Sequence, residues 1–172
     1  MYLSIKIIPA KSEPDLADYS KKPNTIPWPP IITLAAIVIG WVAQKFEYLD
    51  WIVGISATFW PLGVAMVLLA ILVAVWAFFT FKNIDTTIMP NKAASHLATD
   101  GPFRWSRNPI YVGDIVLICG IGLATGNPWM FITAAVAIFA IEEFAIKREE
   151  IHLKAKFGQE WNEYTRRVRR WV

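Results

Sequence analysis

The feature that most constrains the fold is a run of 31 residues without a charged side chain, at residues 51–81. About 20 apolar residues in a helix span the hydrocarbon core of a bilayer, where the backbone must satisfy its own hydrogen bonds. Three shorter apolar runs cover residues 31–43, 110–125 and 128–141, and 55% of the chain is hydrophobic. We therefore predict an all-α, polytopic membrane protein with about four transmembrane helices, an interfacial helix and a cytoplasmic C-terminal helical extension.

Proline and glycine positions indicate how these runs divide. The prolines of "IPWPP" stop any preceding helix, so the first span should begin at Ile31. Pro61 interrupts the longest run, which predicts a short interfacial helix up to about Trp60 and a span over residues 61–81. The glycines of "GIGLATG", residues 120–126, lie inside an expected span with no preceding strand. They predict close helix packing rather than a nucleotide-binding loop.

The second half of the chain has the pattern of a helical hairpin followed by a surface helix. Asn108 suits a helix N-cap, and Pro109 suits the first helical position. A tight turn is expected at residues 126–127, Gly-Asn, so residues 109–147 should form an antiparallel hairpin. The last helix should leave the membrane and stop at Gly158, before a basic, aromatic and amphipathic tail.

Lysine and arginine are distributed unequally between the two sides that four spans define. Residues 1–30, 82–109 and 147–172 share one side and carry 4, 4 and 8 of them, whereas the opposite loops carry only Lys45. Loops rich in lysine and arginine remain in the cytoplasm. We therefore expect a multi-pass protein with both termini in the cytoplasm.

Two polar blocks flank the expected hairpin. The first, "GPFRWSRNPIYVG" at residues 101–113, combines arginines with aromatic rings, and the second, residues 142–150, carries four glutamates. Because an antiparallel hairpin returns to its starting side, both blocks should lie at the same cytoplasmic face. Charged groups at such a boundary usually face a bundle interior, a wet cavity or the headgroups.

Helical spacing predicts how these charges are arranged. Residues seven apart share a helix face, and two pairs of glutamates have this spacing: Glu142 with Glu149, and Glu143 with Glu150. We predict an ion pair between the blocks, formed by Arg104 or Arg107 with Glu142, Glu143 or Glu149. The alternative is that the arginines are interfacial anchors, and this is the interpretation that we favour for "RRVRRW" near the C-terminus, as attraction to anionic lipid.

The two blocks are similar to two motifs of one group of enzymes. "TDGPFRWSRNPIYVG", and "REEIHLKAKFGQEWNEYTRRVRRW" some 35 residues later, resemble the isoprenylcysteine carboxyl methyltransferase and phospholipid methyltransferase group of integral-membrane enzymes. The first motif of that group has the form G-x-[YF]-x-x-x-R-[HN]-P-x-Y-x-G, and the second E-E-x-x-L-x-x-x-F-G-x-x-[YW]-x-x-[YF]. The resemblance covers residues 86–171, about half of the chain.

The resemblance implies methyl transfer from S-adenosylmethionine, with the cofactor held between the last spans and their cytoplasmic ends. Carried over by position, the implied cofactor contacts are Ser95, His96, Leu97, Ala98, Phe103, Asn108, Pro109, Ile110, Tyr111 and Glu149. Asn108 stands where many relatives have histidine, which removes a titratable ring. Ala145 stands where enzymes of the isoprenylcysteine type have an arginine that holds the carboxylate of the acceptor.

The chemistry of methyl transfer is compatible with these residues. S-adenosylmethionine carries a sulfonium, an ammonium and a carboxylate, so its pocket needs acidic groups, donors and rings. In-line methyl displacement needs alignment and exclusion of water, and no metal is expected. Arginines would hold an anionic acceptor and acidic or imidazole groups would serve an amine acceptor; these candidates are Arg104, Arg107, Arg148, Glu142, Glu143 and His152.

We accordingly divide the chain into an N-terminal segment, residues 1–30, two first spans, residues 31–81, and a cofactor-binding half, residues 82–172, with a cytoplasmic active site. The expected partners are a lipophilic or lipidated substrate from the bilayer and membrane lipids, without nucleic acid. The expected acceptor is a carboxylate of the isoprenylcysteine type, with a phospholipid amine or a thiol as alternatives. Two further alternatives are a membrane reductase similar to the sterol reductases and a non-enzymatic lipid-binding protein.

Overall fold

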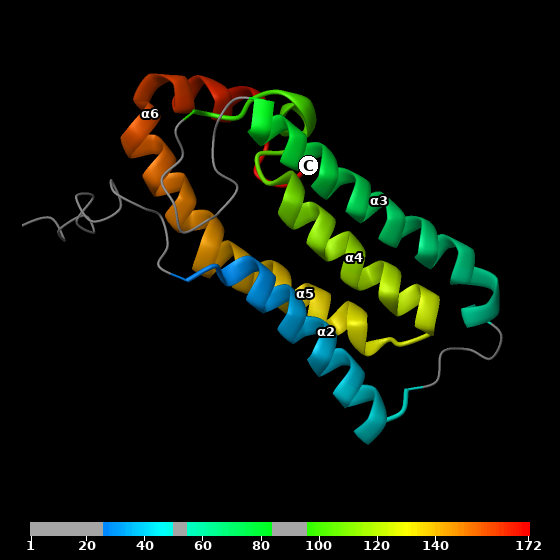
Figure 1. Cartoon of the computed structure of the whole chain (residues 1–172). Coiled ribbons are helices and arrows are strands. Elements are labelled where there is room, and N and C mark those ends of the chain that lie inside the picture. The colour runs from blue at the N-terminus through cyan, green and yellow to red at the C-terminus, as the bar shows by residue number, and fades with distance from the viewer. Residues whose placement is uncertain (1–25, 50–54, 84–95) are drawn as a thin grey trace, which may run out of the picture.

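The computed structural model describes residues 26–49, 55–83 and 96–172, and the regular elements of these residues are all helical. The predicted all-α class is confirmed. In chain order the elements are α2 (Trp28–Phe46), α3 (Ile55–Asn83), the 3-10 helix η1 (Gly101–Arg104), α4 (Pro109–Thr125), α5 (Trp129–Ile141), the π-helix η2 (Glu142–Ile146) and α6 (Lys147–Arg167) (Figure 1).

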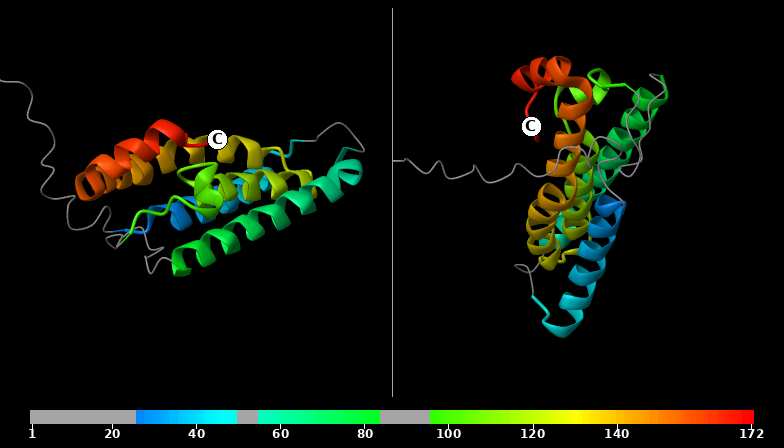
Figure 2. Two further views of the ribbon diagram at one scale, coloured as in Figure 1. Left: turned by 90° about the horizontal axis from the view of Figure 1, so that it is seen from above. Right: turned by 90° about the vertical axis from the view of Figure 1, so that its left-hand side faces the viewer.

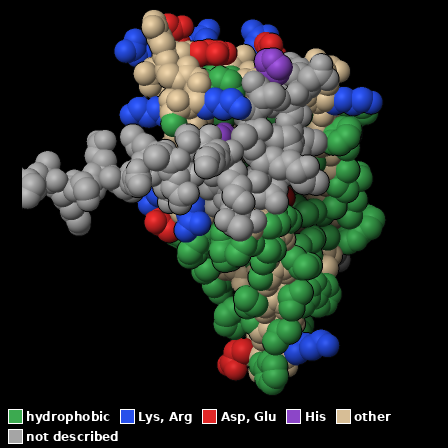
Figure 3. All heavy atoms as spheres, turned by 60° about the vertical axis from the view of Figure 1, so that its left-hand side comes forward, with side chains coloured by type: hydrophobic (Ala, Val, Ile, Leu, Met, Phe, Trp, Pro, Cys, Tyr) green, Lys and Arg blue, Asp and Glu red, His purple; other side chains and the backbone are tan. Residues whose placement is uncertain are grey.

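The apolar helices identify an integral membrane protein. Three helical stretches of the described residues are long and apolar enough to cross a bilayer: Trp28–Phe46, Thr58–Asn83 and Trp129–Arg167. A fourth apolar helix, Pro109–Thr125, is shorter. On the face drawn in Figure 3, hydrophobic side chains cover the lower part, and most of the charged side chains and the histidines that are visible lie toward the upper end.

The helices pack in two neighbouring pairs, α3 with α4 and α2 with α5, and α4 and α5 join the pairs (Figures 1 and 2). Glycines allow α3 and α4 to approach very closely. A Cβ atom at Gly63 would lie 2.4 Å from the backbone nitrogen of Ala124, and one at Gly120 would lie 2.9 Å from the carbonyl oxygen of Gly63. The close helix packing predicted from "GIGLATG" is therefore confirmed.

The prediction of a separate interfacial helix before Pro61 is wrong. From Ile55 the chain is already in α3, and the helix continues through Pro61 without a break. Pro61 lies within the first two turns, where its missing N–H leaves one carbonyl, that of Ala57, without its helical donor. Residues 51–54 of the predicted segment lie outside the described residues.

The hairpin turn forms as predicted. Gly126 ends α4 in the left-handed conformation, with φ of 67°. The side-chain amide of Asn127 donates to the carbonyl of Gly40 at 3.0 Å, and its oxygen accepts from the N–H of Trp129 at 3.0 Å. The turn therefore also ties the hairpin to α2.

The helical path of α5, η2 and α6 continues past Gly158, where the sequence predicts a stop. Gly158 has φ of 50° and ψ of −111°, so the helix breaks there as predicted. It then resumes in a new direction as far as Arg167, which gives α6 two arms (Figure 1). The second arm returns the C-terminal residues toward the beginning of α4.

Candidate functional site

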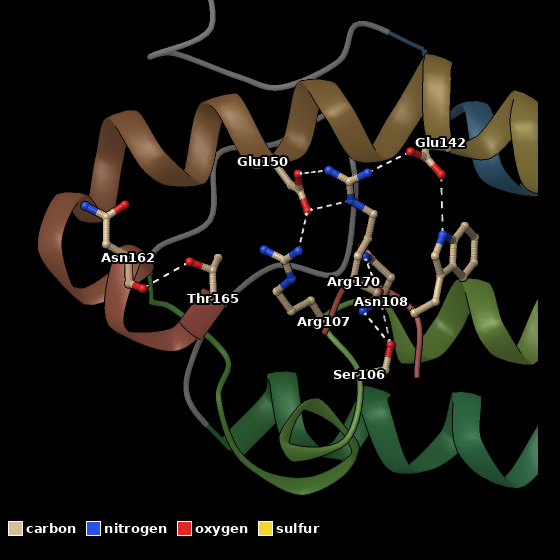
Figure 4. A network of polar contacts seen from close by, with 9 residues as sticks. Ser106, Arg107, Asn108, Glu142, Glu150, Asn162, Thr165 and Arg170 are labelled. Carbon is tan, nitrogen blue, oxygen red and sulfur yellow. Dashed lines mark hydrogen bonds and ion pairs between the residues drawn. The ribbon is translucent and has the colours of Figure 1, made fainter. Parts of the chain in front are cut away.

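The hairpin brings the two polar blocks to one end of the molecule, as the sequence predicts. The start of α4 lies beside the junction of η2 with α6, and the C-terminal residues lie between them (Figure 4). Groups that are far apart in the sequence thereby become neighbours.

A tyrosine and a glutamate join the two blocks directly. The hydroxyl of Tyr111, in the first turn of α4, donates to Oε1 of Glu149, in the first turn of α6, at 2.7 Å. The ring of Tyr111 packs against a buried cluster that includes Ile141 and Ile146. This contact confirms the prediction that the two blocks lie together at one end of the molecule.

Two arginines and two glutamates form a second contact, which we call the Arg–Glu cluster: Arg107, Glu142, Glu150 and Arg170 (Figure 4). Arg170 donates from Nε and Nη2 to the two oxygens of Glu150, at 3.0 and 2.7 Å. Its Nη1 donates to Glu142 at 2.6 Å, and Nη2 of Arg107 lies 3.2 Å from Glu150. The pKa of Arg170 is raised above its ordinary value, chiefly because Glu150 accepts its hydrogen bonds.

The predicted ion pairs are wrong in their partners. Arg107 pairs with Glu150, Glu142 pairs with Arg170, and Glu143 pairs with Lys147 on the same helix. The side chain of Arg104 is exposed on η1. An ion pair between the blocks therefore exists and uses Arg107 as predicted, but its carboxylate is Glu150 rather than Glu142, Glu143 or Glu149.

The π-helix explains this difference. The N–H of Lys147 donates to the carbonyl of Glu142, five residues earlier, so this turn contains one more residue than an α-helical turn. Residues seven apart across η2 consequently no longer share a face. Glu142 and Glu150, eight apart, converge on Arg170, while Glu149 is directed to Tyr111.

The residues before α4 are attached to the C-terminal segment through backbone hydrogen bonds. The side-chain amide of Asn108 donates to the carbonyl of Arg170 at 2.9 Å, and the hydroxyl of Ser106 donates to the same oxygen at 3.3 Å. The N–H of Arg107 donates to the carbonyl of Arg169 at 2.9 Å. Asn108 is the N-cap residue, as predicted, but its side chain makes no capping hydrogen bond because it holds the C-terminal segment instead.

The second arm of α6 supports the first block from the other side. The guanidinium of Arg107 lies 5.5 Å from the ring centre of Trp161, and the hydroxyl of Tyr164 donates to the carbonyl of Phe103 at 2.7 Å. Both aromatic rings are buried. The bend at Gly158 is what places these rings next to residues 103–107.

The other predicted site residues are distributed over a wider area. Ala98 and Phe103 are buried together against Ala77 of α3, with Ile110 packed beside them. His96 is exposed, and Leu97 and Arg148 are half-buried. Pro109 is buried as the first residue of α4. Ser95 lies outside the described residues.

Sequence reasoning missed Arg170 and Trp171 as members of this region. The interpretation of "RRVRRW" as a lipid anchor is wrong for Arg170, whose guanidinium is held by two carboxylates. The ring of Trp171 packs on the cluster around Ile141. The excess of glutamate over arginine in residues 142–150 is the signal that further cations were required there.

Comparisons with known proteins support the resemblance. Residues 59–160 match the phospholipid methyltransferase family. The chain belongs to this family. It is 29% identical over 143 residues to the mouse protein-S-isoprenylcysteine O-methyltransferase, a match that covers 79% of this chain and 49% of the mouse protein.

Other relatives cover similar parts of the chain. Protein-S-isoprenylcysteine O-methyltransferase B of Arabidopsis thaliana is 27% identical over 150 residues, or 80% of this chain and 76% of that protein. The nickel-cobalt-cadmium resistance protein NccN of Alcaligenes xylosoxydans xylosoxydans is 27% identical over 138 residues, or 80% and 59% of the two chains. The chain spans about half the length of the mammalian relatives. No solved structure matches it significantly.

Proposed function

We propose that the protein is an integral-membrane methyltransferase that moves a methyl group from S-adenosylmethionine to a lipophilic acceptor. Membership of the phospholipid methyltransferase family and relatives named protein-S-isoprenylcysteine O-methyltransferase support this function. The observation that carries it is the hydrogen bond between Tyr111 and Glu149, because each residue occupies a central position of one family-like motif.

The polar groups of the site fit the charges of the cofactor. Glu149 accepts a hydrogen bond from Tyr111 through one oxygen, which leaves the other oxygen for an ammonium group. Nε of Arg107 is buried and has no hydrogen-bond partner among the described residues, so it is suited to a carboxylate. Ser95, His96, Leu97, Ala98, Phe103, Asn108, Pro109 and Ile110 remain predicted contacts of the same ligand.

The bound cofactor would supply an electrophilic methyl group on a sulfonium. The protein's own contribution would be to align the acceptor with that methyl group and to exclude water. We assign the anionic acceptor to Arg148, which directly precedes Glu149 in the chain, because Arg107 is proposed for the carboxylate of the cofactor and Arg104 is exposed on η1. Transfer to a carboxylate neutralises charge, so a dry site at the membrane boundary favours it.

The acceptor that these groups favour is a carboxylate of the isoprenylcysteine type. An amine acceptor needs a base, and Glu142 is the predicted candidate. Its two oxygens already accept hydrogen bonds from Arg170 and, at 3.5 Å, from Trp171. A base role for Glu142 therefore has less support than a carboxylate acceptor held by arginine.

The side of the membrane proposed for this site is the cytoplasmic one, because lysine and arginine gather at this end of the molecule (Figure 3).

The test is to incubate the purified protein and a native membrane extract with methyl-labelled S-adenosylmethionine. We expect label in the lipophilic fraction, and release of that label by base, which indicates a methyl ester. Label that base does not release would indicate an amine or thiol acceptor instead of a carboxylate. Absence of transfer, together with retention of reduced nicotinamide cofactor or of neither cofactor, would overturn the methyltransferase proposal.

A further inference from the structure

The C-terminal residues 168–172 are hydrogen-bonded to both polar blocks. We propose that Arg170 is a positioning residue of the active site, which fixes the first block against the second so that Tyr111 and Glu149 meet in the geometry that binds the cofactor. This inference rests on the proposed methyltransferase function.

Arg170 makes contacts to both blocks through different parts of the same residue. Its guanidinium bridges Glu142 and Glu150 on η2 and α6, whereas its carbonyl accepts from Ser106 and Asn108 in front of α4 (Figure 4). A flexible side chain alone would tie the blocks loosely. The additional backbone contact anchors the residue itself, so that the distance between the blocks is set at both ends.

The positive and negative charges of the Arg–Glu cluster are equal in number only when Arg170 is present. Two guanidinium groups then face two carboxylates, whose side chains are 30% exposed at Glu142 and 19% exposed at Glu150. Without Arg170, Arg107 alone would have to neutralise both glutamates, and partly buried carboxylates without a cation repel each other. We expect the start of α6 to move away, and Glu149, adjacent to Glu150 in the chain, to move with it.

The same tail contains a matched control for lipid anchoring. Arg169 is exposed, and its carbonyl rather than its side chain accepts from Arg107. Arg166 and Arg167 are exposed as well. If the tail acted only through attraction to anionic lipid, removal of Arg169 and removal of Arg170 would have the same effect.

The experiment compares Arg170→Ala, Arg170→Lys and Arg169→Ala in the full chain, purified in detergent. Binding of S-adenosylmethionine is measured by calorimetry, and thermal unfolding is measured on the same samples. We expect Arg170→Ala to weaken binding about tenfold or more, since a bidentate charged contact is lost. Arg170→Lys should lie between Arg170→Ala and the wild type, because an ammonium cannot form the planar fork toward two carboxylates. Arg169→Ala should bind like the wild type.

Addition of guanidinium ion at low concentration distinguishes a lost positioning contact from a general loss of fold. The ion can replace the missing side-chain group, but it cannot restore an unfolded protein. It should recover part of the binding of Arg170→Ala and leave Arg169→Ala unchanged. Wild-type affinity in Arg170→Ala or Arg170→Lys would overturn the positioning role, as would equal losses in Arg169→Ala and Arg170→Ala. Failure of the wild type to bind S-adenosylmethionine would instead overturn the proposed function, and the positioning role with it.

Discussion

Two regions hold α4 in place, and they do so with opposite chemistry. Along its length, α4 packs on α3 through backbone contact at Gly63 and Gly120. At its beginning, it is held by charged and polar side chains of the Arg–Glu cluster and by Tyr111. The first region contains almost no group that binds a ligand, and the second contains few residues that fill a core.

This difference indicates that the residues that stabilise the helix packing and the residues that recognise a ligand lie in different regions of this protein. Lipid is as apolar as a leucine side chain, so helices in a membrane gain little from hiding apolar surface and depend on close packing of small residues. Ion pairs and hydrogen bonds at the boundary contribute less to stability but determine what is recognised. Substitutions in the α3–α4 interface should therefore lower stability, whereas substitutions at the polar end should lower binding.

The largest expected effect is that of Gly63→Ala. The added Cβ would lie 2.4 Å from a backbone nitrogen and 2.7 Å from the carbonyl oxygen of Gly120, so the helices must separate. We expect the free energy of unfolding to fall by about 3 kcal/mol, which thermal unfolding in detergent measures.

Gly113→Ala is the matched control in the same interface. Its Cβ would meet its nearest neighbour, the carbonyl oxygen of Ala70, at an ordinary 3.5 Å. Because alanine favours a helix over glycine, we expect stability to be unchanged or raised by up to about 1 kcal/mol. Equal behaviour of the two variants would show that the close backbone contact at Gly63 does not stabilise this interface.

Gly158→Ala should have an intermediate effect and sharpens the comparison at the polar end. Nothing lies within 4 Å of a Cβ at this position, so the cost comes only from the backbone, with φ of 50° and ψ of −111°. We expect a loss of about 1–3 kcal/mol in the free energy of unfolding. Cofactor binding should weaken as well, because the bend places Trp161 against Arg107. A variant as stable as the wild type would show that the left-handed backbone conformation at position 158 does not require glycine.

The smallest effect should come from Lys147→Ala. Lys147 and Glu143 form an ion pair one turn apart, with side chains that are 50% and 61% exposed. Such pairs contribute at most about 0.5 kcal/mol, and less at high salt. Stability and cofactor affinity should both stay close to the wild type in a thermal and calorimetric comparison. A large loss of either would mean that exposed charges at this end matter as much as the Arg–Glu cluster.

The hairpin and the meeting of the two blocks could be predicted from the sequence because they follow from local signals. Asn108-Pro109 and Gly126-Asn127 mark the ends of α4, and a hairpin must return to its starting side. The juxtaposition of Tyr111 with Glu149 follows from that topology and from the motif resemblance.

The pairing of the charges could not be predicted from helical periodicity. One additional residue in the turn of η2 rotates everything after it, and no residue type in "EEFAI" signals a π-helix. The place of Arg170 depends on the bend at Gly158 and on hydrogen bonds to residues more than 60 positions earlier. Pro61 does not divide the longest apolar run, because α3 includes it as its seventh residue.

The measurement that tests the central claim most directly is the affinity of Tyr111→Phe and Glu149→Gln for S-adenosylmethionine, by calorimetry in detergent. Phenylalanine removes only the hydroxyl that donates to Glu149, and glutamine removes the charge and replaces one acceptor oxygen by an NH2 donor. We predict binding at least about tenfold weaker than in the wild type for both, since a contact to a charged group contributes roughly 1.5–3 kcal/mol, with thermal unfolding near that of the wild type. Wild-type affinity in both folded variants would contradict the assignment of this end of the molecule as the cofactor site.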